Sequence, residues 1–549
     1  MQQRITINLN TDSKITGNPT ILEYCRSHGV TGIEAPCGGK GTCGKCKVTV
    51  TKPYYKEVLA CQTRICDGME IIVGRTESTG TGTVGQDIQN ASNAGDSIDK
   101  EDSMVVLTNG GSISKKFNEH VNGHVNRHVV LQEDVTNEPE KAESIEGTLA
   151  ACDIGTTTVV CYLIDKETGQ IISTRSGANP QRSFGADVLS RIEAAGQGEA
   201  ASESGLKIMQ TQIVSLLNGW ISEMLTECSR ASVSVLSVAG NTVMCHLLMG
   251  ISPEKLGKAP FMPDEYFGRA FNPLDIGLEN CQTMIIFPAV SGFVGGDITA
   301  GMMETVNCNE LTLYLDIGTN GEMALGKGDR YVCCATAAGP AFEGAQIELG
   351  MPASKGAVDK VWLEGRRIKY SVIGNDRPVG LCGSGLIDAL AVLLKAGIID
   401  ENGTILRGQE LPILFRSYVF EVEAEETAQS TELSLAVHIA PGVYITQEDI
   451  RKLQLAKGAI AAGIEVLFKE YGCKPCDLDI LTFAGGFGNY IDKASAAAIG
   501  LFPPELLDRA KEVGNAAGNG AVSAALSQEA WERALDISGD MRYIELASY

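Results

Sequence analysis

The chain has 549 residues, more than one hydrophobic core accommodates, so two or three domains are expected. Its hydrophobic content of 44% and charged content of 21% are those of ordinary globular proteins, and its net charge of −23 argues against nucleic acid or an anionic membrane as a partner. No apolar run is long enough to span a bilayer, and the first residues lack the apolar segment of a secretion signal. We therefore expect a cytoplasmic protein without a membrane partner, whose 17 cysteines are free thiols or cluster ligands rather than disulfides.

Residues 1–74 are expected to form a compact β-rich domain. Apolar and polar residues alternate over 3–9, and further strands are predicted over 47–51 and 69–73. Residues 19–26 follow an Asn-Pro start and have helical spacing. A loop that carries cysteines lies between this helix and the later strands, which is the element order of a β-grasp ferredoxin.

Cys37, Cys43, Cys46 and Cys61 are the candidate metal ligands, with the spacing C-x5-C-x2-C-x14-C. The loop around the first three is rich in glycine, which lets backbone amides turn toward inorganic sulfide. Four thiolates on such a loop are typical of a [2Fe–2S] centre, and the extra residue relative to the plant-type C-x4-C-x2-C spacing resembles the loops of vertebrate-type ferredoxins. The alternatives are a structural zinc, which prefers two close C-x2-C pairs, or ordinary thiols, and Cys66 is a fallback ligand.

Residues 75–147 are expected to be a flexible linker. They are rich in Thr, Gly, Ser, Asn and acidic residues, with Phe117 as the one aromatic, so they cannot bury enough apolar surface to fold well alone. A coil of this length reaches roughly 45–50 Å, which lets the N-terminal domain swing between an electron donor and an acceptor. His120, His124 and His128 would share one face of a helix, but in a linker we expect no metal role for them.

Residues 148–549 are expected to be an α/β unit with an internal repeat. The segment around Asp153, an apolar strand that ends in Asp-Ile-Gly-Thr, recurs around Asp316. Each copy continues through a tight turn into a second strand, 159–164 in the first and 322–326 in the second. Two copies at this separation predict two similar lobes facing a cleft, at about 148–305 and 306–549.

The two turns have the chemistry of phosphate binding. Glycine lets backbone amides approach phosphate, threonine hydroxyls add donors, and an aspartate at the strand end holds Mg²⁺ through water and orients a nucleophile. A third apolar strand, 480–484, leads into Gly485-Gly486-Phe487, which is suited to close approach to a nucleoside.

These three motifs in this order resemble the superfamily of acetate and sugar kinases, Hsp70 and actin. The resemblance implies that Asp153 and Asp316 serve Mg²⁺ and the attacking water, with Glu322 as an extra ligand or base. It implies that ATP is held by the residues of the three turns, namely Gly155, Thr156, Thr157, Gly318, Thr319, Asn320, Gly485, Gly486 and Phe487. The alternative is a duplicated α/β scaffold that binds no nucleotide, which leaves both aspartates unexplained.

Other segments are less decisive. Residues 238–246 follow a strand and are candidates to line the cleft, with His246 expected to be a satisfied interior histidine. Residues 339–345 either start a helix near the adenosine or serve packing, and 381–386 enter an apolar helix.

Four other cysteines are candidates for a second cluster. Cys333 and Cys334 are adjacent in a predicted strand, so they point to opposite faces and cannot readily share one iron. Cys473 and Cys476 lack two further partners within one chain, so a cluster there would have to bridge two copies.

The chain as a whole resembles the reductive activators of corrinoid-dependent enzymes. The resemblance rests on the cysteine loop with Val58-Leu59-Ala60-Cys61-Gln62-Thr63, both phosphate motifs, Ala239-Gly240-Asn241-Thr242 and Ala484-Gly485-Gly486-Phe487-Gly488, and the linker takes no part in it. It implies a [2Fe–2S] cluster, ATP and Mg²⁺, a corrinoid protein as acceptor, a low-potential donor such as ferredoxin or flavodoxin, and a possible homodimer.

The implied activity is the return of inactive Co(II) to Co(I) by one-electron transfer. For one electron, about 59 mV of potential difference corresponds to about 1.4 kcal/mol, so electron transfer from a [2Fe–2S] donor to Co(II) can be several kcal/mol unfavourable. ATP can offset this free-energy deficit only by acting differently on two conformations of the protein. The alternatives are an activator of a radical dehydratase, which uses a bridging [4Fe–4S] cluster, and a small-molecule kinase with a redox-sensing domain.

Overall fold

The computed structural model describes most of the chain outside the segment predicted as a linker. The described residues are 3–7, 19–28, 30, 33, 35, 38–39, 46–52, 56–66, 68–73, 147–196, 204–318, 320–423, 433–488 and 490–546. The predicted linker with its three histidines, Cys37, Cys43 and Thr319 therefore lie outside the described residues, as do the side chains of Gly486 and Phe487.

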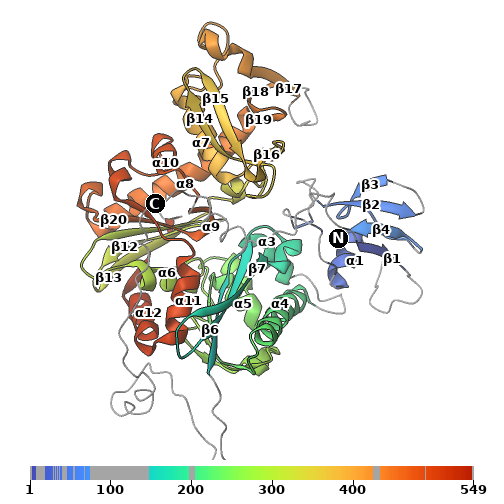
Figure 1. The fold of residues 1–549 in the computed structure, drawn as a ribbon, viewed down its shortest axis with the longest axis vertical. Helices are drawn as coiled ribbons and strands as arrows, with labels where there is room; N and C mark the ends of the chain where they lie inside the picture. Colours follow the sequence, from blue (N-terminus) through green and yellow to red (C-terminus); the bar gives the residue numbers. More distant parts are fainter. Residues whose placement is uncertain are drawn as a thin grey trace, which may run out of the picture. The chain divides into compact units, whose positions relative to one another are not determined.

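The N-terminal domain is a four-stranded antiparallel sheet with one helix (Figure 1). Its elements are β1 (Gln3–Thr6), α1 (Ile21–Ser27), β2 (Lys47–Lys52), β3 (Lys56–Leu59) and β4 (Glu70–Val73), in the sheet order β1-β4-β2-β3. Helix α1 begins at Thr20, whose hydroxyl accepts a hydrogen bond from the Glu23 amide while the Glu23 carboxylate accepts one from the Thr20 amide. The predicted helix and the strands predicted over 47–51 and 69–73 are confirmed, the strand predicted over 3–9 ends at Thr6 within the described residues, and β3 was not predicted.

The first lobe of the ATPase-like unit has a mixed sheet in the order β7-β6-β5-β8-β10-β9. β5 pairs with β6 antiparallel and with β8 parallel. Its strands are β5 (Thr148–Ile154), β6 (Thr158–Asp165), β7 (Ile171–Ala178), β8 (Val233–Gly240), β9 (Arg269–Phe271) and β10 (Cys281–Ile286), and its helices are η2 (Pro180–Phe184), α3 (Val188–Gly196), α4 (Gly205–Glu227), α5 (Thr242–Met249), η3 (Glu254–Gly257), η4 (Pro273–Ile276) and α6 (Gly296–Thr305).

The second lobe repeats this topology. Five strands match in order and direction, because β13-β12-β11-β20-β21 corresponds to β7-β6-β5-β8-β10, with β11 antiparallel to β12 and parallel to β20. The sixth strands lie at opposite edges of the two sheets, β9 beside β10 in the first lobe and β22 beside β13 in the second. The strands are β11 (Thr312–Ile317), β12 (Gly321–Lys327), β13 (Arg330–Thr336), β20 (Ile480–Ala484), β21 (Ala510–Glu512) and β22 (Met541–Tyr543), and the helices are η5 (Pro340–Glu343), α8 (Gln447–Tyr471), η8 (Pro475–Asp477), α9 (Gly485–Gly488), α10 (Lys493–Ala498), η9 (Pro504–Arg509), α11 (Ala516–Leu526) and α12 (Gln528–Asp540). The internal repeat predicted from the two Asp-Ile-Gly-Thr segments is confirmed as a duplicated fold.

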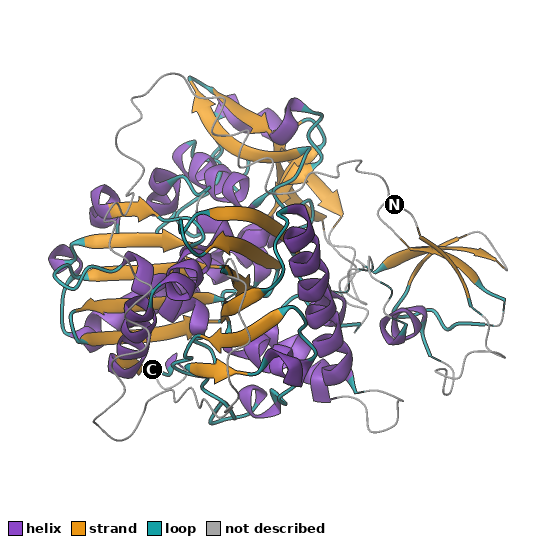
Figure 2. Cartoon of the chain, turned by 60° about the horizontal axis from the view of Figure 1, so that its bottom comes forward, coloured by secondary structure: helices purple, strands orange, loops and turns teal. Residues whose placement is uncertain are grey.

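The two lobes share a hydrophobic core in which helices α6 and α11 pack against each other (Figure 1). Figure 2 shows helices packed around the strands of the sheets. Small residues permit this close approach, because a Cβ added at Gly520 of α11 would lie 2.2 Å from the Ala300 carbonyl of α6. In the described part of the chain, no helix is long and apolar enough to cross a membrane.

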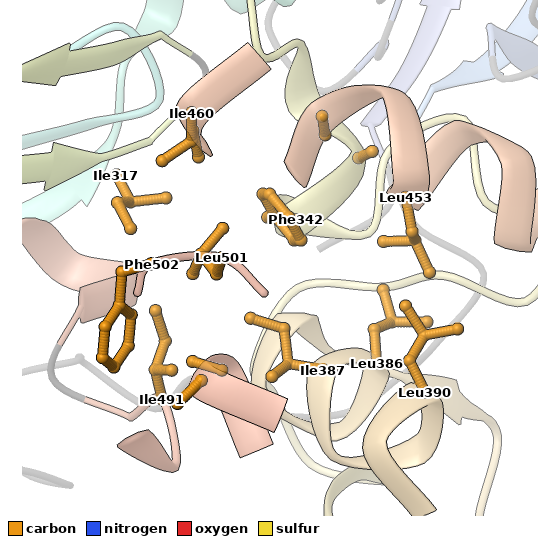
Figure 3. Close-up of a cluster of buried hydrophobic side chains, with 14 of the residues drawn as sticks. Ile317, Phe342, Leu386, Ile387, Leu390, Leu453, Ile460, Ile491, Leu501 and Phe502 are labelled. Atoms are coloured by element: carbon orange, nitrogen blue, oxygen red, sulfur yellow. The ribbon is translucent and has the colours of Figure 1, made fainter. Parts of the chain in front are cut away.

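An accessory region of two three-stranded sheets is inserted between β13 and α8. It contains β14 (Ala357–Glu364), β15 (Arg367–Val372), η6 (Ile373–Asn375), β16 (Gly380–Leu381), α7 (Gly383–Lys395), η7 (Ile413–Tyr418), β17 (Val419–Glu423), β18 (Leu433–Ala440) and β19 (Val443–Thr446). Phe342 of η5, which is fully buried, packs in one core with Leu386 and Ile387 of α7 and Leu453 of α8 (Figure 3). Sequence patterns had not separated this region from the second lobe.

Candidate functional site

The N-terminal domain brings two of the four predicted cluster ligands together. Cys46, which is 1% exposed and directly precedes β2, has its Sγ 3.2 Å from the Sγ of Cys61 after β3. Gly38 and Gly39 of the cysteine loop have φ of +66° and +97°, and a Cβ at Gly39 would lie 3.8 Å from the Cys61 Cβ. This arrangement suits a cluster held by the loop and by the β3 end, while Cys66 is exposed.

The first phosphate turn, between β5 and β6, is held from behind by two side chains that the sequence analysis had not singled out. The Asn179 side-chain amide donates to the Gly155 carbonyl at 2.9 Å, and its backbone amide donates to the Thr157 carbonyl at 2.9 Å. The Arg191 guanidinium, fully buried on α3, donates to the Thr156 carbonyl between them. Three successive carbonyls are therefore bonded, which fixes the turn and suits its hydroxyls and amides to bind an anion.

The second phosphate turn lies beside the third glycine motif. Gly485 has φ of +84°, and a Cβ there would lie 2.5 Å from Asp316 Oδ1, so only glycine fits against this carboxylate. The Gly318 amide donates to the Asn320 carbonyl at 3.0 Å, and a Cβ at Gly318 would meet nothing closer than Glu343 Oε1 at 3.7 Å. The turn is tight, and glycine at 485 keeps a side chain away from the Asp316 carboxylate.

Four carboxyl groups raise one another's pKa around these turns. Burial raises the pKa of Asp153 to about 7, repulsion from Asp316 adds to it, and a hydrogen bond from Asn515 opposes it. Burial also raises the pKa of Asp316 to about 7, with Asp297 contributing, and burial together with Asp153 raises the pKa of Asp297 to about 7. Burial, Asp297 and Asp316 raise the pKa of Glu322 well above its usual range. The site therefore concentrates negative charge that a cation would stabilise.

Glu322 lies opposite Asp316 on the neighbouring strand and is 6% exposed. Its carboxyl group accepts a hydrogen bond of 2.8 Å from the side-chain amide of Asn241, which caps α5 in the other lobe. This contact links the lobes at the site, and the segment 238–246 does contribute to it.

The donor set is compatible with MgATP. Among the described residues, no three His, Cys, Asp or Glu side chains are grouped closely enough to hold a metal ion by themselves. Mg²⁺ readily keeps several waters and takes its other ligands from one or two carboxylates and substrate phosphates. Asp153 and Asp316 at the ends of β5 and β11 suit that mode, with the two turns as the phosphate cradle.

Asp297 and Asn515 are two further site residues that the sequence analysis missed. Asp297 stands in the first turn of α6 after two glycines, and Asn515 caps α11 after Gly514. In each case a glycine precedes a polar residue at the start of an apolar helix, but such a pattern marks any helix start.

Replacing Asp297 with asparagine is expected to stabilise the nucleotide-free protein increasingly as pH rises. The pKa of Asp297 is about 7 in the folded chain, against about 3.9 for an ordinary Asp, so the folded state binds more protons between these values. The stabilisation that Asp297 gives the folded state is fully present below about pH 4 and is lost as pH rises through about 7. The free energy of unfolding falls by at most about 1.4 kcal/mol per pH unit in this range. Asparagine stays neutral throughout.

The measurement is the difference in melting temperature between the variant and the parent at pH 5, 6, 7 and 8. Asp275→Asn is the control, because Asp275 is exposed in the same lobe. We expect the difference for Asp297→Asn to grow from pH 5 to 8, and a difference that is constant with pH would refute the raised pKa.

Two interpretations of other residues are confirmed. Both ring nitrogens of the buried His246 have partners, Nδ1 with the Thr242 carbonyl at 2.8 Å and Nε2 with the Glu265 amide at 3.4 Å. Cys333 and Cys334 on β13 face different cores.

Comparisons with known proteins find matches for the N-terminal domain and for both lobes. Family models match residues 9–66 (2Fe-2S iron-sulfur cluster binding domain), 149–307 (RACo middle region) and 310–549 (C-terminal domain of RACo, the ASKHA domain). The corrinoid activation enzyme RamQ of Eubacterium limosum is 34% identical, over 95% of this chain and 92% of its own length. The [Co(II) methylated amine-specific corrinoid protein] reductase of Methanosarcina barkeri is 27% identical, over 64% of this chain and 65% of its own. A solved structure of a reductive activator for corrinoid, iron-sulfur protein is 28% identical, with a TM-score of 0.64, over 99% of this chain and 94% of that one.

Proposed function

The chain belongs to the family of reductive activators of corrinoid proteins, and we propose that it returns the cobalt of a corrinoid protein from Co(II) to Co(I) at the expense of ATP. The observation that carries this is the coexistence, in one chain, of a ferredoxin-like domain with Cys46 and Cys61 paired at 3.2 Å and a duplicated ATPase fold with both phosphate turns. The match to the RamQ enzyme extends over 95% of the chain, so it takes in both parts.

The [2Fe–2S] centre supplies single electrons, and the four cysteines of the N-terminal domain are its proposed ligands. Cys46 and Cys61 approach each other from the ends of β2 and β3. Cys37 and Cys43 complete the set as sequence-based assignments. We also propose a low-potential ferredoxin or flavodoxin as the donor to this domain, and a homodimer stays a prediction.

ATP binding is assigned to the three turns. Asp153 and Asp316 hold hydrated Mg²⁺ and orient the attacking water, and the two phosphate turns bind the β- and γ-phosphates. The third motif at Gly485 contacts the nucleoside. Asn241 keeps Glu322 oriented toward the site from the other lobe at 2.8 Å. Since Glu322 has a pKa raised well above its usual range, it suits a proton-holding role better than direct cation binding.

The test is an anaerobic spectroscopic assay. The reduced holoprotein is mixed with a Co(II) corrinoid protein, and the visible spectrum is followed for Co(I) with and without MgATP. Co(I) that forms only with MgATP supports the proposal. An intact cluster with no Co(I) across several corrinoid proteins would instead favour a dehydratase activator or a redox-regulated kinase, which iron stoichiometry and phosphoryl transfer to an added acceptor would separate.

A further inference from the structure

The carboxylate of Glu343 is hydrogen-bonded to the first phosphate turn and lies beside the second. Its Oε2 accepts a hydrogen bond of 3.0 Å from the Thr157 hydroxyl in the first turn. Its Oε1 lies beside the second turn, 3.7 Å from where a Cβ at Gly318 would stand. An acidic group on η5 is therefore seated between the two turns that are proposed to bind phosphate.

The surroundings of this carboxylate favour an anion. The guanidinium of Arg191 lies behind the first turn and donates hydrogen bonds to the carbonyls of Gly185 and Thr156 and to the Met244 sulfur. None of these three partners is a carboxylate. Burial lowers the pKa of Arg191 to about 9, with Arg182 acting the same way and Asp187 and Glu343 opposing them, so Arg191 is charged at neutral pH. Carboxylate and phosphate oxygens use the same hydroxyl and backbone donors.

The position of Glu343 is fixed by its neighbours. Phe342 is fully buried in the core shared with α7 and α8 (Figure 3), and Gly344 follows with φ of +77°, where a Cβ would clash with the backbone at Met351 at 2.6 Å. The segment cannot retreat far from the turns without moving η5, which packs on both α7 and α8.

We infer that in the nucleotide-free protein Glu343 occupies the place between the two turns that the terminal phosphate of ATP takes when ATP binds. Displacement of Glu343 by that phosphate makes the response of the protein to ATP differ from its response to ADP. The inference rests on the proposed nucleotide site. ADP leaves Glu343 hydrogen-bonded to Thr157. ATP brings a second anion to the same donors, so the carboxylate must leave, and the hydrogen bond that joins η5 to the first lobe is broken. Glu343 is thus a positioning residue whose hydrogen bond to Thr157 depends on whether the terminal phosphate is bound.

The test measures nucleotide affinity on the anaerobic holoprotein by titration calorimetry, with MgADP and with the Mg²⁺ complex of a non-hydrolysable ATP analogue. Glu343→Gln keeps the size of the side chain and removes the charge that the phosphate must displace. We expect the Kd for the ATP analogue to fall about tenfold, with the Kd for MgADP within about twofold of the parent. The matched control is Glu348→Gln, an exposed carboxylate five residues on that accepts from the Tyr444 hydroxyl, and it should change neither Kd.

A second variant, Glu343→Ala, removes the charge by another route and must give the same selective gain. Equal changes for both nucleotides would mean a general structural role, and weaker binding of the ATP analogue would mean that Glu343 serves the cation; either result overturns the inference. Absence of binding by the parent protein would instead refute the nucleotide site on which the inference rests.

Discussion

Replacing Cys46 with serine is expected to abolish Co(I) formation while ATP hydrolysis continues. Cys46 is 1% exposed and its Sγ lies 3.2 Å from that of Cys61, so the pair supplies two of four thiolates from one side of the proposed centre. A serine hydroxyl is a much poorer ligand for iron than a thiolate. We expect loss of the visible absorption and bound iron of the cluster, and a fall in Co(I) formation of at least about 100-fold.

The strands that carry the phosphate turns pack in hydrophobic cores other than that of the N-terminal domain, so the ATPase rate of Cys46→Ser should stay within about twofold. Cys66→Ser is the control, because Cys66 is exposed in the same domain and should be dispensable. Cys43→Ser, at a position outside the described residues, should match Cys46→Ser. If Cys46→Ser still produced Co(I) at the parental rate, the N-terminal domain could not be the electron carrier.

The structural features that the sequence predicted well are those that depend on short segments of the chain. The two Asp-Ile-Gly-Thr segments predicted the strand, turn and second strand of each lobe because these residues are adjacent in the sequence, and five strands of the two lobes share one topology. Helix α1 was predictable from its helical spacing, although it begins at Ile21 with Thr20 as its cap rather than at the Asn-Pro pair. The accessory region between β13 and α8 was not predicted, since its strands have the same local pattern as those of a lobe, and only their pairing separates them.

Three asparagines of the site, of which only Asn241 lay in a segment that the sequence analysis had indicated, have partners that they meet only in the folded chain. Asn179, Asn241 and Asn515 each cap a helix with the side-chain oxygen, by accepting from the amides of Gln181, Val243 and Gly518 respectively. Their side-chain amides are left as donors.

Each of these amides is used at the site or beside it. That of Asn179 bonds the Gly155 carbonyl and that of Asn241 bonds the Glu322 carboxyl. The side chain of Asn515 bonds Asp153, whose pKa it lowers, and Tyr162. Aspartate would cap these helices as well but could not donate. From sequence an asparagine here indicates only a helix start, so its second role needs the tertiary structure.

Replacing Asp316 with asparagine is expected to have the second large effect, on ATP hydrolysis rather than on the cluster. Asp316 lies at the end of β11, its Oδ1 lies against Gly485, and it is one of three aspartates, with Asp153 and Asp297, whose pKa is raised to about 7. Asparagine has the same shape but no charge to hold hydrated Mg²⁺ or orient water. We expect the MgATP hydrolysis rate to fall at least about 100-fold, while the cluster loads and accepts an electron as in the parent.

Stability separates this effect from misfolding. The neutral amide removes repulsion among Asp153, Asp297 and Asp316, so the melting temperature of nucleotide-free Asp316→Asn should equal or exceed that of the parent at pH 8. Asp508→Asn is the control, because Asp508 is exposed in the same lobe, and it should keep full hydrolysis. Parental hydrolysis by Asp316→Asn would remove the second turn from the catalytic site. Loss of ATP hydrolysis with an unchanged melting temperature would assign Asp316 to the hydrolysis reaction itself. Together with the Cys46 result, it would divide the chain into a domain that carries the electron and a domain that supplies the free energy.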